Sequence, residues 1–190
     1  MPAQAVVVIA SGHTAKAAFY ERTGGEWTKL VDTKGCVGKA GITSDKREGD
    51  KKTPKGVFPL TFAFGIKVPE TKMEFRQITD ESYWVDDASS EYYNTWQEGC
   101  KGWKSAEKLS EYADYYRYAI AIGYNQECTP GMGSAIFLHC KRKAHTTGCI
   151  AVPERALLDM LKLLDPDKRP VIIIASSVRE AESHGILDIE

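Results

Sequence analysis

The 190-residue sequence lacks several features that would assign it to a common class of protein. Its five cysteines form no Cys-x-x-Cys pair, which excludes zinc ribbons and thioredoxin-type redox motifs. Neither charge is in excess, because 25 Lys and Arg face 26 Asp and Glu, so the basic footprint of a nucleic-acid-binding protein is absent. No apolar run approaches the roughly 18 residues of a membrane span.

The beginning of the sequence also lacks the marks of a signal peptide. No basic segment precedes the apolar run of residues 5–10, and this run is too short for the hydrophobic part of a leader. The sequence as given therefore predicts either a cytosolic protein or a mature chain whose leader has been removed. Its length suits one domain, or one domain with a sizeable insertion.

The apolar pattern predicts a protein made mainly of strands. Strands are expected at residues 5–10, 15–22, 27–32, 57–64, 116–122, 134–140 and 171–175, the second and third forming a hairpin. One helix is expected at residues 153–164, with Pro153 at its first position and an apolar face of Leu157, Met160, Leu161 and Leu164. Residues 53–56 are expected to form a turn.

The middle of the sequence has no clean periodicity and is rich in aromatic residues. We interpret residues 67–114 as an irregular insertion, with a short helix near residues 105–112. A long irregular stretch of this kind is typical of a lid or binding loop. Asp86 and Asp87, with the tyrosines and tryptophans around them, are its candidate lid residues; ordinary core packing of these aromatics is the alternative.

Chemically reactive residues gather in residues 136–153, IFLHCKRKAHTTGCIAVP. A zinc site built from His139, Cys140, His145 and Cys149 is one interpretation of this stretch. It is disfavoured because His139 and Cys140 are adjacent on a predicted strand, so their side chains point to opposite faces. Cys140, inside an apolar strand, is expected to be a structural cysteine or half of a disulfide. The pairing of Cys36, Cys100, Cys128 and Cys140 is left open.

Cys149 is the candidate nucleophile. It follows Thr146-Thr147-Gly148, where a glycine allows close approach of substrate and backbone N–H groups of Thr147 and Gly148 can stabilise an oxyanion. The basic run of residues 141–143 is expected to lower the pKa of this thiol. His139 is the candidate base because a strand can hold it rigidly, whereas His145 lies in a basic loop and is expected to be solvated.

This segment resembles the L,D-transpeptidase catalytic domain, also called the YkuD domain. That family has a histidine at a strand end, a variable loop and then Ser/Thr-His-Gly-Cys; here the matching residues are His139, the loop of residues 140–145, and Thr146 to Cys149. The segment GDKKTPKGVFPL at residues 49–60 also resembles the family. Three features depart from its pattern: Thr147 stands for His, Ala151 for the usual Arg or Asn, and the interval from His139 to Cys149 is short. The sequence is most similar to a Thr-x-Gly-Cys branch.

The resemblance implies a curved mixed β-sandwich with a short helix after the nucleophile, and one catalytic domain over residues 1–190. It implies acylation of Cys149 by a peptidoglycan stem peptide, transfer to an amine, inhibition by carbapenem-type β-lactams, an extracytoplasmic location, and no metal or organic cofactor. Arg142 or Lys141 would replace the missing Arg in binding the substrate carboxylate. The remaining candidate substrate-binding residues are Thr146, Tyr83, Trp84, Asp86 and Tyr93.

Two other functions compete with this one. A sortase-like transpeptidase also places His before Cys but needs an Arg on the strand after the cysteine, and none is present there. A cell-wall-binding module without catalysis would use Trp84, Tyr93 and Trp96 to stack on sugars, and would need no reactive thiol.

Overall fold

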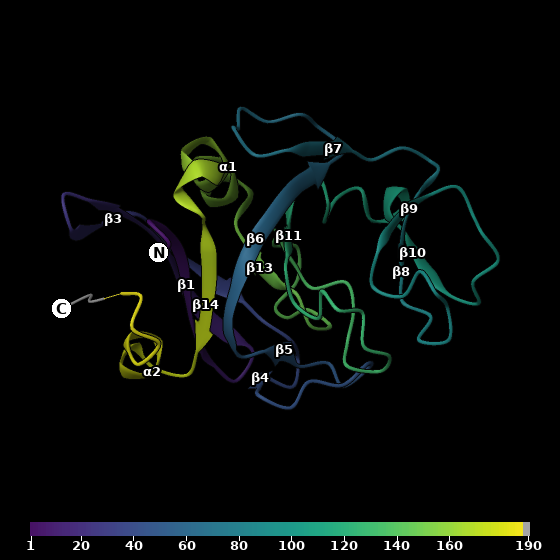
Figure 1. The fold of residues 1–190 in the computed structure, drawn as a ribbon, viewed down its shortest axis with the longest axis horizontal. Helices are drawn as coiled ribbons and strands as arrows, with labels where there is room; N and C mark the ends of the chain where they lie inside the picture. The colour runs from purple at the N-terminus through teal and green to yellow at the C-terminus, as the bar shows by residue number, and fades with distance from the viewer. Residues whose placement is uncertain (188–190) are drawn as a thin grey trace.

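A computed structural model describes residues 1–187, and its main feature is a nine-stranded sheet that closes on itself (Figure 1). In order across the sheet the strands are β11 (Ala119–Ile122), β12 (Phe137–Cys140), β13 (Ile150–Val152), β3 (Glu26–Cys36), β2 (Thr14–Thr23), β1 (Gln4–Ser11), β14 (Val171–Ala175), β6 (Gly56–Gly65) and β7 (Phe75–Gln77). The sheet closes because β6 pairs with β14 through its first residues and with β11 through its later ones. The protein is mainly β, as expected, but its sheet is barrel-like, which corrects the expected sandwich.

The interior of this sheet holds the largest apolar cluster. Alternate residues of β1, β12, β13 and β14 enter it, and α1 (Glu154–Leu163) contributes Leu157, Met160 and Leu161. These three side chains lie on one face because they are three or four residues apart. Pro153 stands at the N-cap position, one residue before the expected place. Burial of this apolar face therefore holds α1 against the sheet directly after β13.

The strands predicted from the sequence are present with shifted ends. The hairpin is formed by β2 and β3, and β14 covers the predicted residues 171–175. β11 and β12 each begin three residues later than predicted. Residues 53–56 are not a simple turn, because β5 (Thr53–Pro54) pairs with β4 (Ile42–Thr43). The outer face of β1 and β14 is covered by α2 (Val178–Glu182), and η2 (Pro166–Lys168) precedes β14.

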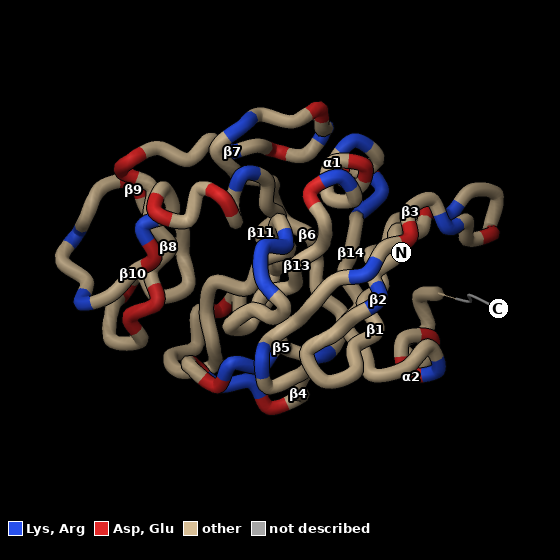
Figure 2. The backbone as a smooth tube through the Cα atoms, turned by 180° about the vertical axis from the view of Figure 1, so that it is seen from behind, with Lys and Arg blue, Asp and Glu red and all other residues tan. Residues whose placement is uncertain are grey.

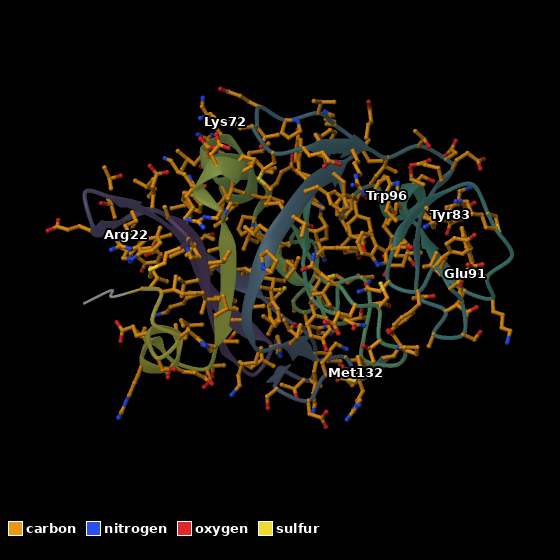
Figure 3. All side chains as sticks on the ribbon, in the orientation of Figure 1. Arg22, Lys72, Tyr83, Glu91, Trp96 and Met132 are labelled. Atoms are coloured by element: carbon orange, nitrogen blue, oxygen red, sulfur yellow. The ribbon has the colours of Figure 1, made fainter. Side chains whose placement is uncertain are left out.

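The insertion is more regular than the sequence predicts. It contains a three-stranded sheet of β10 (Ala106–Lys108), β8 (Ser82–Val85) and β9 (Trp96–Glu98), and the expected helix near residues 105–112 is β10 followed by the 3₁₀ helix η1 (Leu109–Tyr112). This sheet stands to one side of the closed sheet (Figure 1), and the labelled Tyr83 and Trp96 extend from it (Figure 3). Its short strands escape periodicity analysis because three or four residues show too little alternation.

The insertion packs on the outer face of β11 and β12 through a second apolar cluster. Trp84 lies with its ring centroid 4.8 Å from that of Phe137, and Tyr116, Leu109 and Cys149 belong to the same cluster. Among residues 1–187, none of the helices has the length and apolar character needed to cross a membrane.

Candidate active site

His139 lies on β12, and Cys149 directly precedes the parallel neighbour β13 on the same outer face of the sheet. The register pairs Leu138 with Ile150 and His139 with Ala151, so Cys149 is a diagonal neighbour of His139. Cys140 points the other way, into the interior cluster, as the alternation of a strand predicts. Both His139 and Cys149 line one cavity of about 310 Å³. The sheet therefore brings the predicted nucleophile and base to a single opening.

The thiol of Cys149 is buried and hydrogen-bonded in its neutral form. The residue is 7% exposed, its Sγ donates to the carbonyl oxygen of Ala135 at 3.2 Å, and the N–H of Phe137 points at Sγ from 3.4 Å. Burial raises the pKa of the Cys149 thiol well above its usual range, and Glu107 adds to this. The Phe137 N–H and Lys46 act in the opposite direction. The resting side chain is therefore a thiol, not a thiolate.

Ala135 is held in place by the insertion. Its φ of +54° lies in the left-handed region, which non-glycine residues adopt only when their surroundings enforce it. Its N–H donates to Oδ1 of Asn94 at 3.1 Å, and the same oxygen accepts a hydrogen bond from the Trp84 indole at 3.0 Å. Asn94 thus fixes the carbonyl that orients the resting thiol.

His139 is positioned as a neutral base. Its Nδ1 lies 3.0 Å from the carbonyl oxygen of Cys140, and because a carbonyl can only accept, Nδ1 carries the proton and Nε2 keeps its lone pair. Burial lowers the pKa of His139 to about 4, so the ring is neutral at pH 7. The rings of Tyr115 and Tyr116 meet it edge-on at 6.0 and 5.5 Å between centroids.

The thiol does not point at this base. Within the described residues the recorded hydrogen bonds of the Cys149 thiol run to Ala135 and Phe137, and none joins it to His139. Rotation about the Cα–Cβ bond of Cys149 would have to turn the thiol from Ala135 toward the imidazole. Hydrogen bonds between a nucleophile and its base are often long without substrate and shorten in the reacting complex.

The loop before Cys149 is braced by two threonines. Thr146 Oγ1 donates to the carbonyl oxygen of Cys149 at 2.6 Å and accepts from the Gly148 N–H at 3.1 Å. Thr53 of β5 donates to the carbonyl oxygen of Gly148 at 2.7 Å and accepts from the N–H of Gly38. Gly148 has a φ of +155°, and a Cβ there would lie 3.2 Å from the carbonyl oxygen of Lys52. Only glycine fits this position without displacement.

A second cavity, of about 230 Å³, opens on the other side of the thiol. It shares Glu107, Thr147 and Cys149 with the first cavity, and it also contains charged side chains of the β4–β5 loop: Lys46, Glu48 and Lys51. Lys46 is 4% exposed and its ammonium contacts Asp50 at 2.7 Å and the carbonyl oxygen of Arg47 at 2.6 Å. Lys and Arg positions gather in the loop next to β5 (Figure 2).

Glu107 brings a carboxyl group to the junction of the two cavities. It lies on β10 opposite Trp84, and its Oε2 accepts a hydrogen bond from the Tyr116 hydroxyl at 2.7 Å. Burial raises the pKa of Glu107 to about 7, the hydrogen bond from Tyr116 lowers it, and the charges of Asp86 and Glu48 raise it further. This carboxyl group can therefore change protonation state near neutral pH.

The family of the chain follows from its sequence. A family model of the L,D-transpeptidase catalytic domain matches residues 4–173. The chain belongs to this family. L,D-transpeptidases act on peptidoglycan, are inhibited by carbapenems and are typically extracytoplasmic.

One similar solved structure is that of Bdellovibrio bacteriovorus Bd1075, at 17% sequence identity and a TM-score of 0.44. The alignment covers 96% of this chain and 52% of that one, so this chain spans about half the length of that relative. No curated protein matches the sequence.

Ala151 stands where the L,D-transpeptidase family usually has Arg or Asn, and the structure shows its surroundings. Ala151 is buried, pairs with His139 and Cys36, and lines the first cavity. A small residue there leaves space that the Arg or Asn usual at this position would fill. Of the two proposed substitutes for that Arg, Arg142 lines the first cavity and Lys141 does not line either cavity. Arg142 already donates to Glu154 at 2.6 Å, while Lys143 beside it also lines the cavity.

The basic run is not the source of positive charge at the thiol of Cys149. The cation that lowers the pKa of Cys149 is Lys46, more than one hundred residues earlier in the chain. Arg142 lies in an ion pair with Glu154 and donates to the carbonyl oxygen of Asp114. The expectation that residues 141–143 activate the thiol finds no support here, because Arg142 is paired with Glu154 and Lys46 is the cation that acts on Cys149.

The predicted residues of the insertion have separate places. Asp86 lines the second cavity, and the Asp87 carboxylate accepts hydrogen bonds from the N–H groups of Ser89 and Lys104. Trp84 and Tyr93 are 7% and 1% exposed: Trp84 packs on Phe137, and the Tyr93 hydroxyl accepts from the Gly133 N–H at 3.0 Å. Tyr83 packs on Trp103 instead of entering either cavity that contains Cys149.

Sequence reasoning missed four residues of the site: Lys46, Thr53, Glu107 and Tyr116. Thr53 carried a signal, since it lies in the segment that resembles the family, but it had been assigned to a turn. Glu107 and Lys46 carried no signal in the sequence. A lone acid or lysine of an active site looks the same in a polar segment as one that is solvated at the surface. Within residues 1–187, no group of three or more His, Cys, Asp or Glu side chains is arranged to hold a metal ion.

Proposed function

We propose that this protein is an L,D-transpeptidase that acts on peptidoglycan stem peptides through a thioester on Cys149. The observation that carries the proposal is the shared placement of Cys149 and His139, which lie on one face of β12 and β13 and line one cavity. Family membership supplies the substrate class. In this proposal residues 1–190 form one catalytic domain, residues 67–114 cover the site as a lid, and the enzyme works outside the cytoplasm.

The first step begins from a neutral thiol and a neutral imidazole. The thiol passes its proton to Nε2 of His139 while Sγ attacks the carbonyl carbon that precedes the terminal D-alanine. The Cys140 carbonyl stabilises the imidazolium through Nδ1, and the Phe137 N–H stabilises negative charge on sulfur. The imidazolium then protonates the departing amine of D-alanine, and its low pKa makes it a strong acid for this purpose.

The oxyanion of this step would lie beside residues 147–149. The Thr147 and Gly148 backbone remains our candidate for its stabilisation, because both residues line the second cavity next to the thiol. The Gly148 N–H is bonded to Thr146 Oγ1, so Thr146 would have to release it as substrate enters. Thr146 thus acts in this proposal as a gate for the donor as well as a brace of the loop.

The substrate carboxylate is proposed to bind at the basic rim of the first cavity. Arg142 and Lys143 line that cavity, and Lys143 has no ion pair within the described chain. Lys141 is the weaker candidate because it lines neither cavity. Attraction of an anion to this rim favours encounter with the stem peptide more than tight binding.

The competing functions find less support. Sugar stacking by Trp84, Tyr93 and Trp96 would require exposed rings, whereas Trp84 and Tyr93 are buried and the half-buried Trp96 packs edge-on to Phe64. A sortase-like enzyme needs an Arg near the nucleophile, and the corresponding strand β13 consists of Ile150, Ala151 and Val152.

Intact-mass spectrometry of the protein incubated with a carbapenem tests the proposal. The strained carbonyl of the drug is open to the same nucleophile, so we expect one added drug mass in the wild type and none in Cys149→Ala. A second assay follows conversion of a purified disaccharide-tetrapeptide by mass. Absence of both the adduct and any conversion would overturn the proposed function.

A further inference from the structure

The position of Glu107 sets it apart from the other acids of the protein. It lies on β10 of the insertion, yet it lines both cavities together with Cys149 and Thr147. A group at the junction of two openings meets whatever approaches the thiol from either side. The acyl group and its acceptor must come together at this junction, because the acyl group is held on Sγ of Cys149 and the acceptor has to reach its carbonyl carbon.

Glu107 has no cationic partner within the described residues. Its one recorded hydrogen bond comes from the Tyr116 hydroxyl to Oε2, at 2.7 Å, and no ion pair includes it. Lys46, the cation next to the thiol, is engaged by Asp50 at 2.7 Å. A half-buried carboxyl group without a cation is unfavourable as a carboxylate, and a cationic ligand would relieve this.

The groups around Glu107 make this point of the site attractive to a cation. Asp86 from the end of β8 and Glu48 from the β4–β5 loop act on it electrostatically and line the second cavity with it. Tyr112 and Tyr116 face it from η1 and the following loop, and Cys149 faces it from the residue before β13. The cations of the second cavity are Lys46 and Lys51. Three acids therefore line this cavity with two lysines, one of which is already paired.

We infer that Glu107 binds the ammonium group of the acyl acceptor and accepts a proton from it, and so directs the Cys149 thioester toward an amine instead of water. This inference rests on the proposed function and names the residue that selects the acceptor. An ammonium group fits because it is a cation, and because its nitrogen becomes nucleophilic only after a proton is removed.

The protons of the second step balance as follows. The Glu107 carboxylate takes one proton from the acceptor ammonium, and the free amine attacks the thioester carbon. His139 takes the second proton from the attacking nitrogen as the new amide bond forms. The carbon–sulfur bond breaks, the sulfur of Cys149 recovers a proton from His139, and Glu107 releases its own proton to solvent. The pKa of about 7 for Glu107 suits this transfer at neutral pH.

The test measures the ratio of two products formed by the same thioester. With a disaccharide-tetrapeptide whose diamino acid ends in an ammonium group, cross-linked dimer reports aminolysis and tripeptide reports hydrolysis. We expect Glu107→Gln to lower the dimer-to-tripeptide ratio by about 10²-fold, the lower range for loss of a general base. The ratio is taken within each enzyme, so a change in acylation rate cancels. Glu111→Gln, an exposed acid of η1, is the matched control and should leave the ratio unchanged.

Hydroxylamine separates proton removal from general damage to the site. It is uncharged at neutral pH, so we expect Glu107→Gln to form the hydroxamate at nearly the wild-type ratio to hydrolysis. Tyr116→Phe removes the hydrogen bond that lowers the pKa of Glu107. It should therefore move the rise of the dimer-to-tripeptide ratio to higher pH, which a merely structural role would not do.

The outcomes are distinct. A fall confined to the ammonium acceptor supports the inference. An unchanged ratio, or an equal fall with hydroxylamine, overturns it while the thioester still appears by intact mass. If wild-type protein forms no thioester, the proposed function itself is wrong and the inference falls with it.

Discussion

The two faces of the β12–β13 pair carry similar residues in different surroundings. On the inner face Cys140 is fully buried among Leu138, Val152 and the residues of α1, and its thiol donates to the carbonyl oxygen of Tyr118 at 3.5 Å. On the outer face Cys149 lines two cavities beside His139. The comparison teaches that what lies across from the sulfur, not burial alone, separates a structural thiol from a candidate nucleophile, since both are less than one tenth exposed.

The strongest test of this comparison exchanges each thiol for a methyl group. Cys149→Ala should abolish thioester formation and turnover while leaving the fold intact. Cys140→Ala should keep turnover and instead lower the free energy of unfolding by about 1 kcal/mol, the scale of one lost buried group. Product mass and denaturant unfolding of both variants check this. Wild-type turnover in Cys149→Ala, with loss in Cys140→Ala, would reverse the assignment.

The next test compares the two histidines of the segment. His139→Ala should reduce turnover by about 10² to 10⁴-fold, because it removes a general base held by the Cys140 carbonyl. His145, which is half-buried in a loop against His13, should matter much less when replaced by Ala. Steady-state rates at saturating substrate measure the difference. A larger effect at His145 would mean that the loop supplies the base.

The brace between β5 and the nucleophile loop should affect both stability and rate. Thr53→Val keeps the shape of the side chain but leaves the Gly38 N–H and the Gly148 carbonyl oxygen without this partner. We expect a loss of about 1–3 kcal/mol in unfolding free energy, together with slower acylation of Cys149. Thr28→Val, at an exposed position of β3, is the control. Equal stability of the two variants would show that the brace contributes nothing.

The smallest effect concerns the carboxyl group that the insertion brings to the outer face. The pKa of Glu107 is raised in the folded protein to about 7 from 4.5, so folding favours its protonated form. Its contribution to stability is therefore present below pH 4.5 and is lost as the pH rises through 7. Glu107→Gln should match the wild type near pH 4 and be more stable than it near pH 8, as measured by thermal unfolding. A constant difference across this range would contradict the raised pKa.

The predictability of the fold followed the length of each element. β1, the β2–β3 hairpin, β6, β14 and α1 were recoverable because each shows several repeats of its period or a clear turn. The strands of the insertion span only three or four residues, and their pairing depends on partners more than ten residues away. Closure of the sheet by β6 and β11 was equally invisible, because strand pairing across sixty residues leaves no local pattern.

In the site, too, the features set by neighbouring residues could be predicted and those set by distant segments could not. The opposite directions of His139 and Cys140 follow from the two-residue period of a strand, and this was predicted correctly. The ion pair of Arg142 was not predicted, because Arg142 meets Glu154 only when α1 packs beside it.

The sequence by itself determined the strand-forming runs, the order His139 before Cys149 and the family to which the chain belongs. These depend on neighbours within a few residues or on a compact motif. Only the tertiary structure decided that Lys46 and Glu107 flank the thiol, that Ala135 orients it, and that it rests protonated. The physical reason is that burial and electrostatic environment arise from segments that meet only when the insertion packs on the closed sheet.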